Sequence, residues 1–377
     1  MQKKIFAACC ILACAFVFLK TQKYFICNNV SVLKAENREE LMEAAFPYGT
    51  LLKEIYGYSN RVISPNEKIS GAKTTIKDKD GYLQPIYMAN TGVVAKAKSK
   101  ILELDQICRQ EGVKFSFISY PSKTNSTTLP TTYGVDTNYE EIRKNFLDYL
   151  DKNNVDHLNV RELLENDGYT TKDIFYKTDH HWKTTAGFYA ARAIAEYLNE
   201  TYNWNLNSGA LDKDKFTFTT YHNLWFGEEG RNLSRAWVGA LDDFIQIMPN
   251  YDTSITLQYP DKDETSGDFS ELVDSSGYDG NEVYYRYSAH YSYAKGMGSS
   301  MTYHNNLADE NGKKILLIKD SFSVVVIPFL ILETSDITVW DMRSNKDGLY
   351  QYIRDNDFDV VLLAYTDFWR DDMWNFN

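Results

Sequence analysis

The sequence has 377 residues, 44% of them hydrophobic and 24% charged, so the chain can bury a large core as one big domain or two small ones. A net charge of −12 argues against nucleic acid as a partner. Three of the five cysteines lie in the first apolar run, which leaves no disulfide framework and no cysteine-based metal site. The 28 tyrosines fit both a sugar-binding surface and a β-rich core.

The N-terminus resembles a targeting signal. Lys3 and Lys4 precede an uncharged apolar run over residues 5–19, and two more lysines follow it. A positive start before a hydrophobic stretch is typical of a secretory signal, but the run is shorter than the ~20 residues of a membrane-spanning helix. We therefore interpret residues 1–27 as a signal peptide or membrane anchor and residues 28–79 as a stalk or linker. This places the rest of the chain outside the cytoplasm.

Strand and helix patterns alternate in the folded domain, which we predict over residues 80–377. Helices are predicted over 93–111, 138–152, 184–202 and 348–355, and strands over 113–120, 157–160, 315–318, 336–340 and 358–364. The alternation predicts an α/β fold with a parallel sheet covered by helices on both faces. A short helix is expected to begin at Ser321 and to be limited by Pro328.

The alternation breaks over residues 203–308. This stretch is rich in Tyr, Asn, Asp, Gly, Ser and Thr and holds only short alternating runs. We interpret it as a β- and loop-rich insertion that shapes the substrate cleft.

A catalytic triad is predicted from two separate stretches. Asp179 and His181 are two residues apart, so in an extended segment the carboxylate can hold one ring nitrogen while the other faces a reactant. Ser321 follows a predicted buried strand, at the sheet edge where open α/β folds bind ligands. A serine hydroxyl needs an adjacent base, which His181 would supply. The backbone N–H of Ser321, at a helix start, would stabilise an oxyanion.

The same stretch also has the residue types of a metal site. Asp179, His180 and His181 could ligate a metal, but adjacent residues rarely all bind one ion, and no spaced third histidine is evident. The sequence therefore predicts neither a metal nor a cofactor. His180 is expected to be structural, and Trp182 is favoured as a packing residue over a sugar platform.

These motifs resemble the DHHW family, within the SGNH-hydrolase-like extracellular proteins that include the bacterial alginate O-acetylation proteins. The resemblance covers roughly residues 80–366 and rests on Pro121-Ser122-Lys123, Phe175-Tyr176-Lys177-Thr178-Asp179-His180-His181-Trp182, Lys319-Asp320-Ser321-Phe322, Ile327-Pro328-Phe329-Leu330 and Asp341-Met342-Arg343. It implies a flavodoxin-like SGNH-type α/β/α sandwich with a triad of Ser321, His181 and Asp179. Lys319 departs from the usual Gly, and a side chain there could narrow the approach to the serine.

The resemblance also implies a function. It indicates a serine-dependent O-acetyltransferase or acetylesterase that acts on a cell-surface or secreted polysaccharide through an acyl-enzyme. Family analogy adds a membrane O-acyltransferase partner on the donor side. The alternative is a non-catalytic glycan-binding or scaffold protein that keeps the fold. Candidates for substrate contacts or a second oxyanion donor are Ser122, Lys123, Asn125, Trp182 and Arg343.

Overall fold

The computed structural model describes residues 15, 19, 49–63, 69–70, 74–78, 80–85, 90–123, 139–239, 241–278, 288–295, 300–309, 311–366 and 370–377. They fall into two compact units. The smaller contains residues 15 and 19, helix α3 (Gly49–Ile63) and residues Leu233–Trp237, and the larger contains the other described residues. Helix α3 lies within the stretch interpreted as a stalk or linker.

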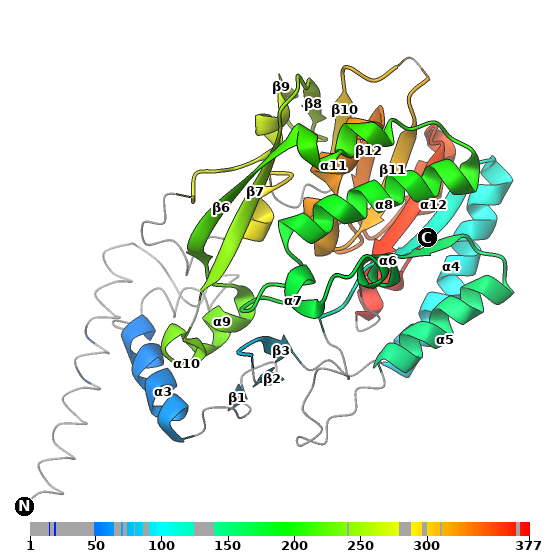
Figure 1. The fold of residues 1–377 in the computed structure, drawn as a ribbon. Helices are drawn as coiled ribbons and strands as arrows, with labels where there is room; N and C mark the ends of the chain where they lie inside the picture. Colours follow the sequence, from blue (N-terminus) through cyan, green and yellow to red (C-terminus); the bar gives the residue numbers. More distant parts are fainter. Residues whose placement is uncertain are drawn as a thin grey trace, which may run out of the picture. The chain divides into compact units, whose positions relative to one another are not determined.

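The larger unit is built around an eight-stranded sheet (Figure 1). Its order is β5-β4-β13-β11-β12-β10-β8-β9, and the five strands from β5 to β12 pair in parallel. These strands are β4 (Lys114–Ser119), β5 (His157–Asn159), β8 (Ile255–Gln258), β9 (Thr265–Gly267), β10 (Thr302–Asn305), β11 (Lys314–Lys319), β12 (Asp336–Trp340) and β13 (Val360–Tyr365). The predicted parallel α/β sheet is therefore confirmed for its five-stranded part.

Helices cover both faces of this sheet, and α8 crosses in front of the strands in Figure 1. The helices of the larger unit are α4 (Thr91–Glu111), α5 (Tyr139–Lys152), α6 (Val160–Asn166), α7 (Thr171–Ile174), α8 (Thr184–Tyr202), α9 (Glu228–Leu233), α11 (Ile327–Leu330) and α12 (Leu349–Asp355), while α10 (Arg235–Val238) lies mostly in the smaller unit. Buried side chains of α6, α8 and α11 pack in one core cluster, and those of α4, α5 and α12 pack in a second.

The central strands read as unbroken apolar runs because both of their faces are buried. In β11, Ile315 and Leu317 point into the core cluster that contains α8, whereas Leu316 and Ile318 point into the cluster that contains α4. The period-2 alternation of a strand divides the run between two cores. β11 ends at Lys319, and Asp320 separates this end from Ser321.

Residues 203–308, interpreted as a β- and loop-rich insertion, contribute strands to the central sheet. Strands β8, β9 and β10 extend the central sheet through antiparallel pairings that begin at β12. Its other two strands, β6 (Phe216–Trp225) and β7 (Asp242–Pro249), form an antiparallel hairpin. A small three-stranded sheet is made by β1 (Ile69–Ser70), β2 (Thr74–Lys77) and β3 (Leu83–Pro85).

One helix boundary differs from the prediction. A 3-10 helix runs over Ser321–Val325, and Pro328 lies in the first turn of α11 rather than after the end of a helix. The first turn tolerates proline because its N–H groups have no helical partner there.

Among the described residues, no helix combines the length and apolar character needed to cross a membrane. The predicted signal or anchor segment lies, apart from residues 15 and 19, outside the described part of the chain.

Candidate active site

The Asp-His-His-Trp stretch forms a tight loop before α8. Phe175 and Trp182 form an antiparallel bridge that closes it. The buried Asp242 carboxylate, from β7, accepts the backbone N–H groups of Lys177 and Thr178 at 2.6 and 2.7 Å and the Thr178 hydroxyl at 2.6 Å. The insertion therefore fixes the loop that carries the histidines.

The structure brings the three predicted triad residues together. His181 Nε2 lies 2.8 Å from Ser321 Oγ, and His181 Nδ1 lies 2.6 Å from Asp179 Oδ1. His181 and Asp179 are buried, whereas Ser321 is partly exposed. An oriented base beside an accessible hydroxyl is the arrangement that activates a serine nucleophile.

A second clamp holds the Asp179 carboxylate. Its Oδ1 also accepts the His181 backbone N–H at 2.9 Å, and its Oδ2 accepts the Glu228 N–H at 2.5 Å. Gly227, just before Glu228, passes so close that a Cβ there would lie 2.2 Å from the Asp179 Cβ. Only glycine allows this approach, so Gly227 is part of what sets the carboxylate position.

Ser321 is positioned by the loops that follow β11 and β13. The buried Asp320 carboxylate accepts the N–H groups of Phe322 at 2.9 Å and Thr366 at 2.7 Å. Burial raises the pKa of Asp320 to about 6, although these hydrogen bonds oppose the shift. As the first residue of the 3-10 helix, Ser321 has a backbone N–H that the helix does not use.

Three imidazole rings stack across the site. The His180 and His181 ring centroids are 3.9 Å apart, and those of His181 and His290 are 4.0 Å apart with the planes 19° from parallel. Burial alone would lower the pKa of His180, but Glu229 and Asp179 raise it to about 9. Burial lowers the pKa of His181 most, and the cationic His180 lowers it further, while the Asp179 carboxylate raises it; the resulting pKa is about 4. His181 is therefore neutral at pH 7 and free to accept a proton.

Two residues of the site, His290 and Tyr291, were not predicted from the sequence. His290 is fully buried, and its Nε2 donates to the Ser321 carbonyl oxygen at 2.8 Å. Burial keeps the pKa of His290 well below its usual value, so the ring is neutral. Tyr291 packs edge-on to His181 at 5.6 Å, and burial, followed by the nearby Asp179 carboxylate, raises its pKa to about 12. Both residues lie in a tyrosine-rich part of the insertion that carries no recognisable motif.

The other candidate residues take different positions. Lys123 is buried, and its ammonium donates to the carbonyls of Lys177 at 3.1 Å and Asp179 at 2.7 Å. These two bonds hold the loop that carries Asp179 and His181. Ser122 is also buried, and its carbonyl accepts from Arg161 at 3.1 Å. Asn125 lies outside the described residues.

Trp182 occupies a packing position. Its side chain is fully buried, its indole N–H donates to the Phe322 carbonyl at 2.9 Å, and its ring packs 4.9 Å from that of Tyr120. In this structure no face of the indole is open to a sugar ring. The favoured interpretation of Trp182 as a core residue fits this placement.

Arg343 remains near the triad. It is partly exposed and donates to both oxygens of Asp341 at 2.8 and 2.5 Å. Its charge also lowers the pKa of His181, as one of several smaller effects. Lys319, expected to narrow the approach to the serine, is instead 1% exposed, with its ammonium 3.0 Å from Asp341. The Lys319 side chain is therefore buried rather than exposed beside the serine.

Asp179, His180 and His181 offer three potential metal-ligand atoms within 4.8 Å of one another. Both Asp179 oxygens and His181 Nδ1 are already hydrogen-bonded within the loop and to Glu228. The donor set therefore suits proton transfer better than metal binding.

Comparison with known proteins supports this description. Residues 89–240 match the family model of the SGNH hydrolase-like domain of the acetyltransferase AlgX. No curated protein sequence matches the chain. The structure of Bacillus cereus PatB1 with a sulfonyl adduct is 22% identical, with a TM-score of 0.64 over 83% of this chain and 99% of PatB1. A DHHW family protein from Eubacterium siraeum is 19% identical, with a TM-score of 0.56 over 79% of this chain and 92% of that protein. The predicted resemblance to the SGNH-like and DHHW proteins is confirmed.

Proposed function

We propose that this chain, with its SGNH hydrolase-like domain of the AlgX acetyltransferase type, is a serine-dependent O-acetyltransferase that modifies a cell-surface or secreted polysaccharide outside the cytoplasm. The observation that carries the proposal is the hydrogen-bonded series from Asp179 through His181 to Ser321, built from segments 140 residues apart.

In the first half-reaction, Ser321 Oγ attacks the carbonyl carbon of an acetyl ester while His181 Nε2 takes the hydroxyl proton. The tetrahedral oxyanion is stabilised by the Ser321 backbone N–H, with Arg343 supplying positive charge nearby. Collapse of the intermediate breaks the ester bond, and His181 returns its proton to the departing alkoxide. The product is an acetyl ester on Ser321.

In the second half-reaction, a sugar hydroxyl attacks this ester and gives its proton to His181. Collapse releases the acetylated sugar, and Ser321 regains the proton. Water in place of the sugar would give hydrolysis, so the acceptor site decides between transferase and esterase. Asp179 keeps the imidazole in the tautomer whose Nε2 faces the serine and stabilises the imidazolium.

The location is part of the proposal. The lysine-flanked apolar run at residues 5–19 supports export, with the chain held at a membrane or released from it. A membrane O-acyltransferase would supply the acetyl donor. A non-catalytic glycan-binding role would not need an oriented base beside an accessible serine, so the triad geometry favours catalysis.

The test is intact-mass spectrometry of the full chain, purified in mild detergent and exposed to p-nitrophenyl acetate. Wild type should gain one acetyl group, and Ser321→Ala should gain none. Ser323→Ala is the matched control, since this buried hydroxyl is bonded to Tyr120 at 3.0 Å. Asp179→Asn should acylate ~10³–10⁴-fold more slowly. An equal adduct on Ser321→Ala would sink the proposal. Transfer is then measured by adding polysaccharide to the acylated protein.

A further inference from the structure

A large cleft lies at the opposite edge of the central sheet from Ser321. It has a volume of about 860 Å³, within the range of about 300–1,000 Å³ typical of ligand sites. Its walls come from the chain after α8, from the turn between β10 and β11, and from the residues before β12. Lys313 precedes β11 and Ser321 follows it, so roughly 20 Å of strand separates the two places. We call this cavity the amino-edge cleft.

Side-chain amides dominate the cleft. Asn203, Asn205, Asn207 and Asn311 line it with no side-chain hydrogen bond to any described residue. By contrast, the Asn305 amide, in the same cleft, is bonded to the Ile331 carbonyl at 3.1 Å and to the Leu307 N–H at 3.1 Å. Each open amide offers both donors and an acceptor. Such groups match hydroxyl groups, which also donate and accept.

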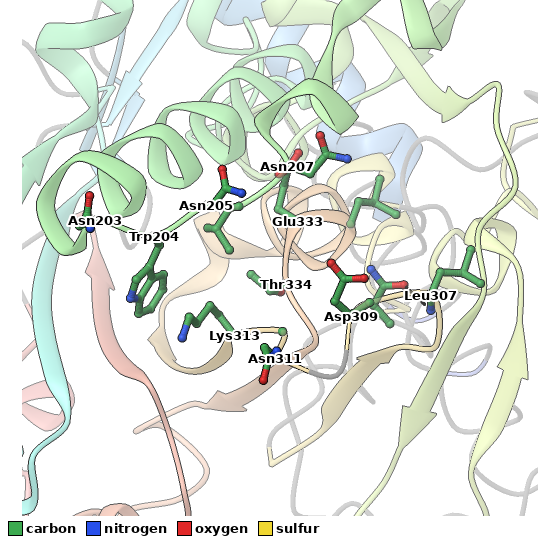
Figure 2. Close-up of a pocket in the computed structure, with 15 residues that line it drawn as sticks. Asn203, Trp204, Asn205, Asn207, Leu307, Asp309, Asn311, Lys313, Glu333 and Thr334 are labelled. Carbon is green, nitrogen blue, oxygen red and sulfur yellow. Dashed lines mark hydrogen bonds between the residues drawn. The ribbon is translucent and has the colours of Figure 1, made fainter.

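An aromatic side chain stands among these amides. Trp204 is half-buried, whereas the other tryptophans in the described part of the chain are at most 7% exposed. In Figure 2, Trp204 lies beside Asn203 and Asn205 on one side of the cleft, with Lys313, Asn311 and Asp309 facing them. A half-buried indole offers part of its apolar surface to a ligand, and its N–H can meet a polar partner.

A buried carboxyl group lies between the two sides (Figure 2). Glu333 is 7% exposed, and neither side-chain oxygen has a hydrogen-bond partner among the described residues. The Leu211 N–H lies near enough to favour the ionised form but not in hydrogen-bonding geometry. Burial raises the pKa of Glu333 to about 8, so at pH 7 it is a neutral acid with an unused donor and acceptor. Burying a polar group without a hydrogen-bond partner costs free energy, and a ligand that bonds to the group would remove this cost.

The charges of the cleft argue against ionic ligands. Lys313, its cation, already pairs with Asp359 at 3.1 Å, and its ammonium lies 5.1 Å from the Trp204 ring centroid. Asp309 is an exposed carboxylate that would repel an anion. Among the described residues that line the cleft, a phosphate or nucleotide would find no unpaired cation. A purely apolar ligand would leave the amides unmatched.

We propose that the amino-edge cleft binds an uncharged stretch of a saccharide chain, with the Trp204 indole against a sugar-ring face and the open asparagine amides hydrogen-bonded to ring hydroxyls. Glu333 donates to one further hydroxyl. The cleft is separate from the triad, so it would hold a saccharide segment distant from the reacting unit. The identification of that saccharide with the acetyl acceptor rests on the proposed function, but the binding does not.

The test uses the full chain labelled with 5-fluorotryptophan, with the Trp204 resonance assigned from Trp204→Phe. The probes are uncharged tetramers of glucose, mannose and N-acetylglucosamine, with tetragalacturonate as the anionic comparison. We expect at least one neutral tetramer to shift the Trp204 resonance saturably and to bind at least ~5-fold more tightly than the anionic one.

Calorimetry on variants gives a second readout. Trp204→Ala and the double variant Asn205→Ala/Asn207→Ala should each weaken binding ~10-fold or more, and Trp204→Phe should keep most of it. Asn356→Ala is the matched control, since that amide is bonded within its own segment to the Tyr352 carbonyl at 2.8 Å. Ser321→Ala should bind as wild type does.

Three results would overturn the inference. The first is that no tetramer shifts the Trp204 resonance at about 10 mM, a concentration above the dissociation constants of weak specific binding. The second is binding that Trp204→Ala leaves unchanged. The third is binding that Ser321→Ala abolishes, which would place the ligand at the triad. If the protein fails to acylate but Trp204-dependent binding persists, the proposed function is wrong and this inference stands.

Discussion

At the carboxyl edge of the central sheet, Asp179, His181 and Ser321 direct their polar atoms at one another, whereas at the amino edge Asn203 and Asn205 have no side-chain partner among the described residues. The first edge holds its groups through buried hydrogen bonds. The second leaves its groups open. Catalysis needs a geometry fixed before the substrate arrives, while binding can leave polar groups to be satisfied by the ligand.

The two edges should therefore respond differently to the same kind of change. Gly227→Ala would push a methyl group against Asp179 and the Thr178 carbonyl, at 2.2 and 2.6 Å. We expect a loss of about 1–3 kcal/mol in the free energy of unfolding and a drop of ~10²-fold or more in acylation rate. Denaturant unfolding measures the loss of stability, and the rate of acyl-enzyme formation measures the loss of activity.

Gly209→Ala, next to the amino-edge cleft, is the matched control. Its added Cβ would meet nothing nearer than the Asn207 side-chain oxygen at 3.4 Å, which is ordinary contact. Acylation by this variant should equal that of wild type. Equal effects of the two substitutions would show that the triad edge is not the more tightly fixed one.

His290 tests whether the triad depends on the insertion. His290→Phe keeps a ring to stack on His181 but loses the donor to the Ser321 carbonyl, and we expect acylation to slow ~10-fold. His290→Gln keeps an amide donor and loses the stacked ring. Measuring both separates the two contacts. A fold-stabilising role alone would lower the melting temperature of both variants while leaving the acylation rate of the folded protein unchanged.

His180 tests the electrostatics of the same edge. Cationic His180 lowers the pKa of His181, whose value of about 4 sets the acidic limb of the rate profile. The neutral base is the active form, so the rate rises with pH through that pKa. Removing the cation in His180→Gln should raise the pKa of His181 and move the limb upward by about one pH unit.

The pH dependence of acylation by the full chain measures this shift. His304→Gln is the control, because His304 pairs with Asp336 on the sheet, at 2.7 Å, and is not part of the ring stack. A limb that does not move in His180→Gln would mean that the His180 charge is not felt at His181.

The sequence predicted much of the carboxyl edge because its signals are local. An Asp-x-His pair and a serine after a buried strand can be read within a few residues, and the apolar runs of β11 and β13 gave the parallel sheet that joins them. The positions of all five parallel strands were predicted to within two residues.

The rest depends on contacts that are distant in sequence. His290, Tyr291 and Asp242 reach the site only because the insertion folds over it, and nothing in their local sequence marks them. Strands β8 to β10 are three or four residues long, too short to show whether they join the central sheet. The burial of Lys319 depends on Asp341, on the neighbouring strand end.

Glu333 provides a comparison at the amino edge that needs no ligand. Its folded pKa of about 8 lies above the ordinary 4.5, so the native state holds a proton that the unfolded chain releases. The stability from this group is complete below pH ~4.5 and is lost as pH rises to about 8. Glu333→Gln mimics the neutral acid and does not titrate. As the pH rises from 5 to 8, its free energy of unfolding should therefore increase by about 2–4 kcal/mol relative to that of wild type.

Denaturant unfolding of the Glu333→Gln variant and wild type across that range gives the difference directly. Asp309→Asn, at the exposed carboxylate of the same cleft, serves as the control and should track wild type. A constant difference between Glu333→Gln and wild type at every pH would mean that Glu333 titrates alike in both states. The buried, unpartnered acid would then be absent, and the amino edge would lose one of the features that sets it apart from the triad edge.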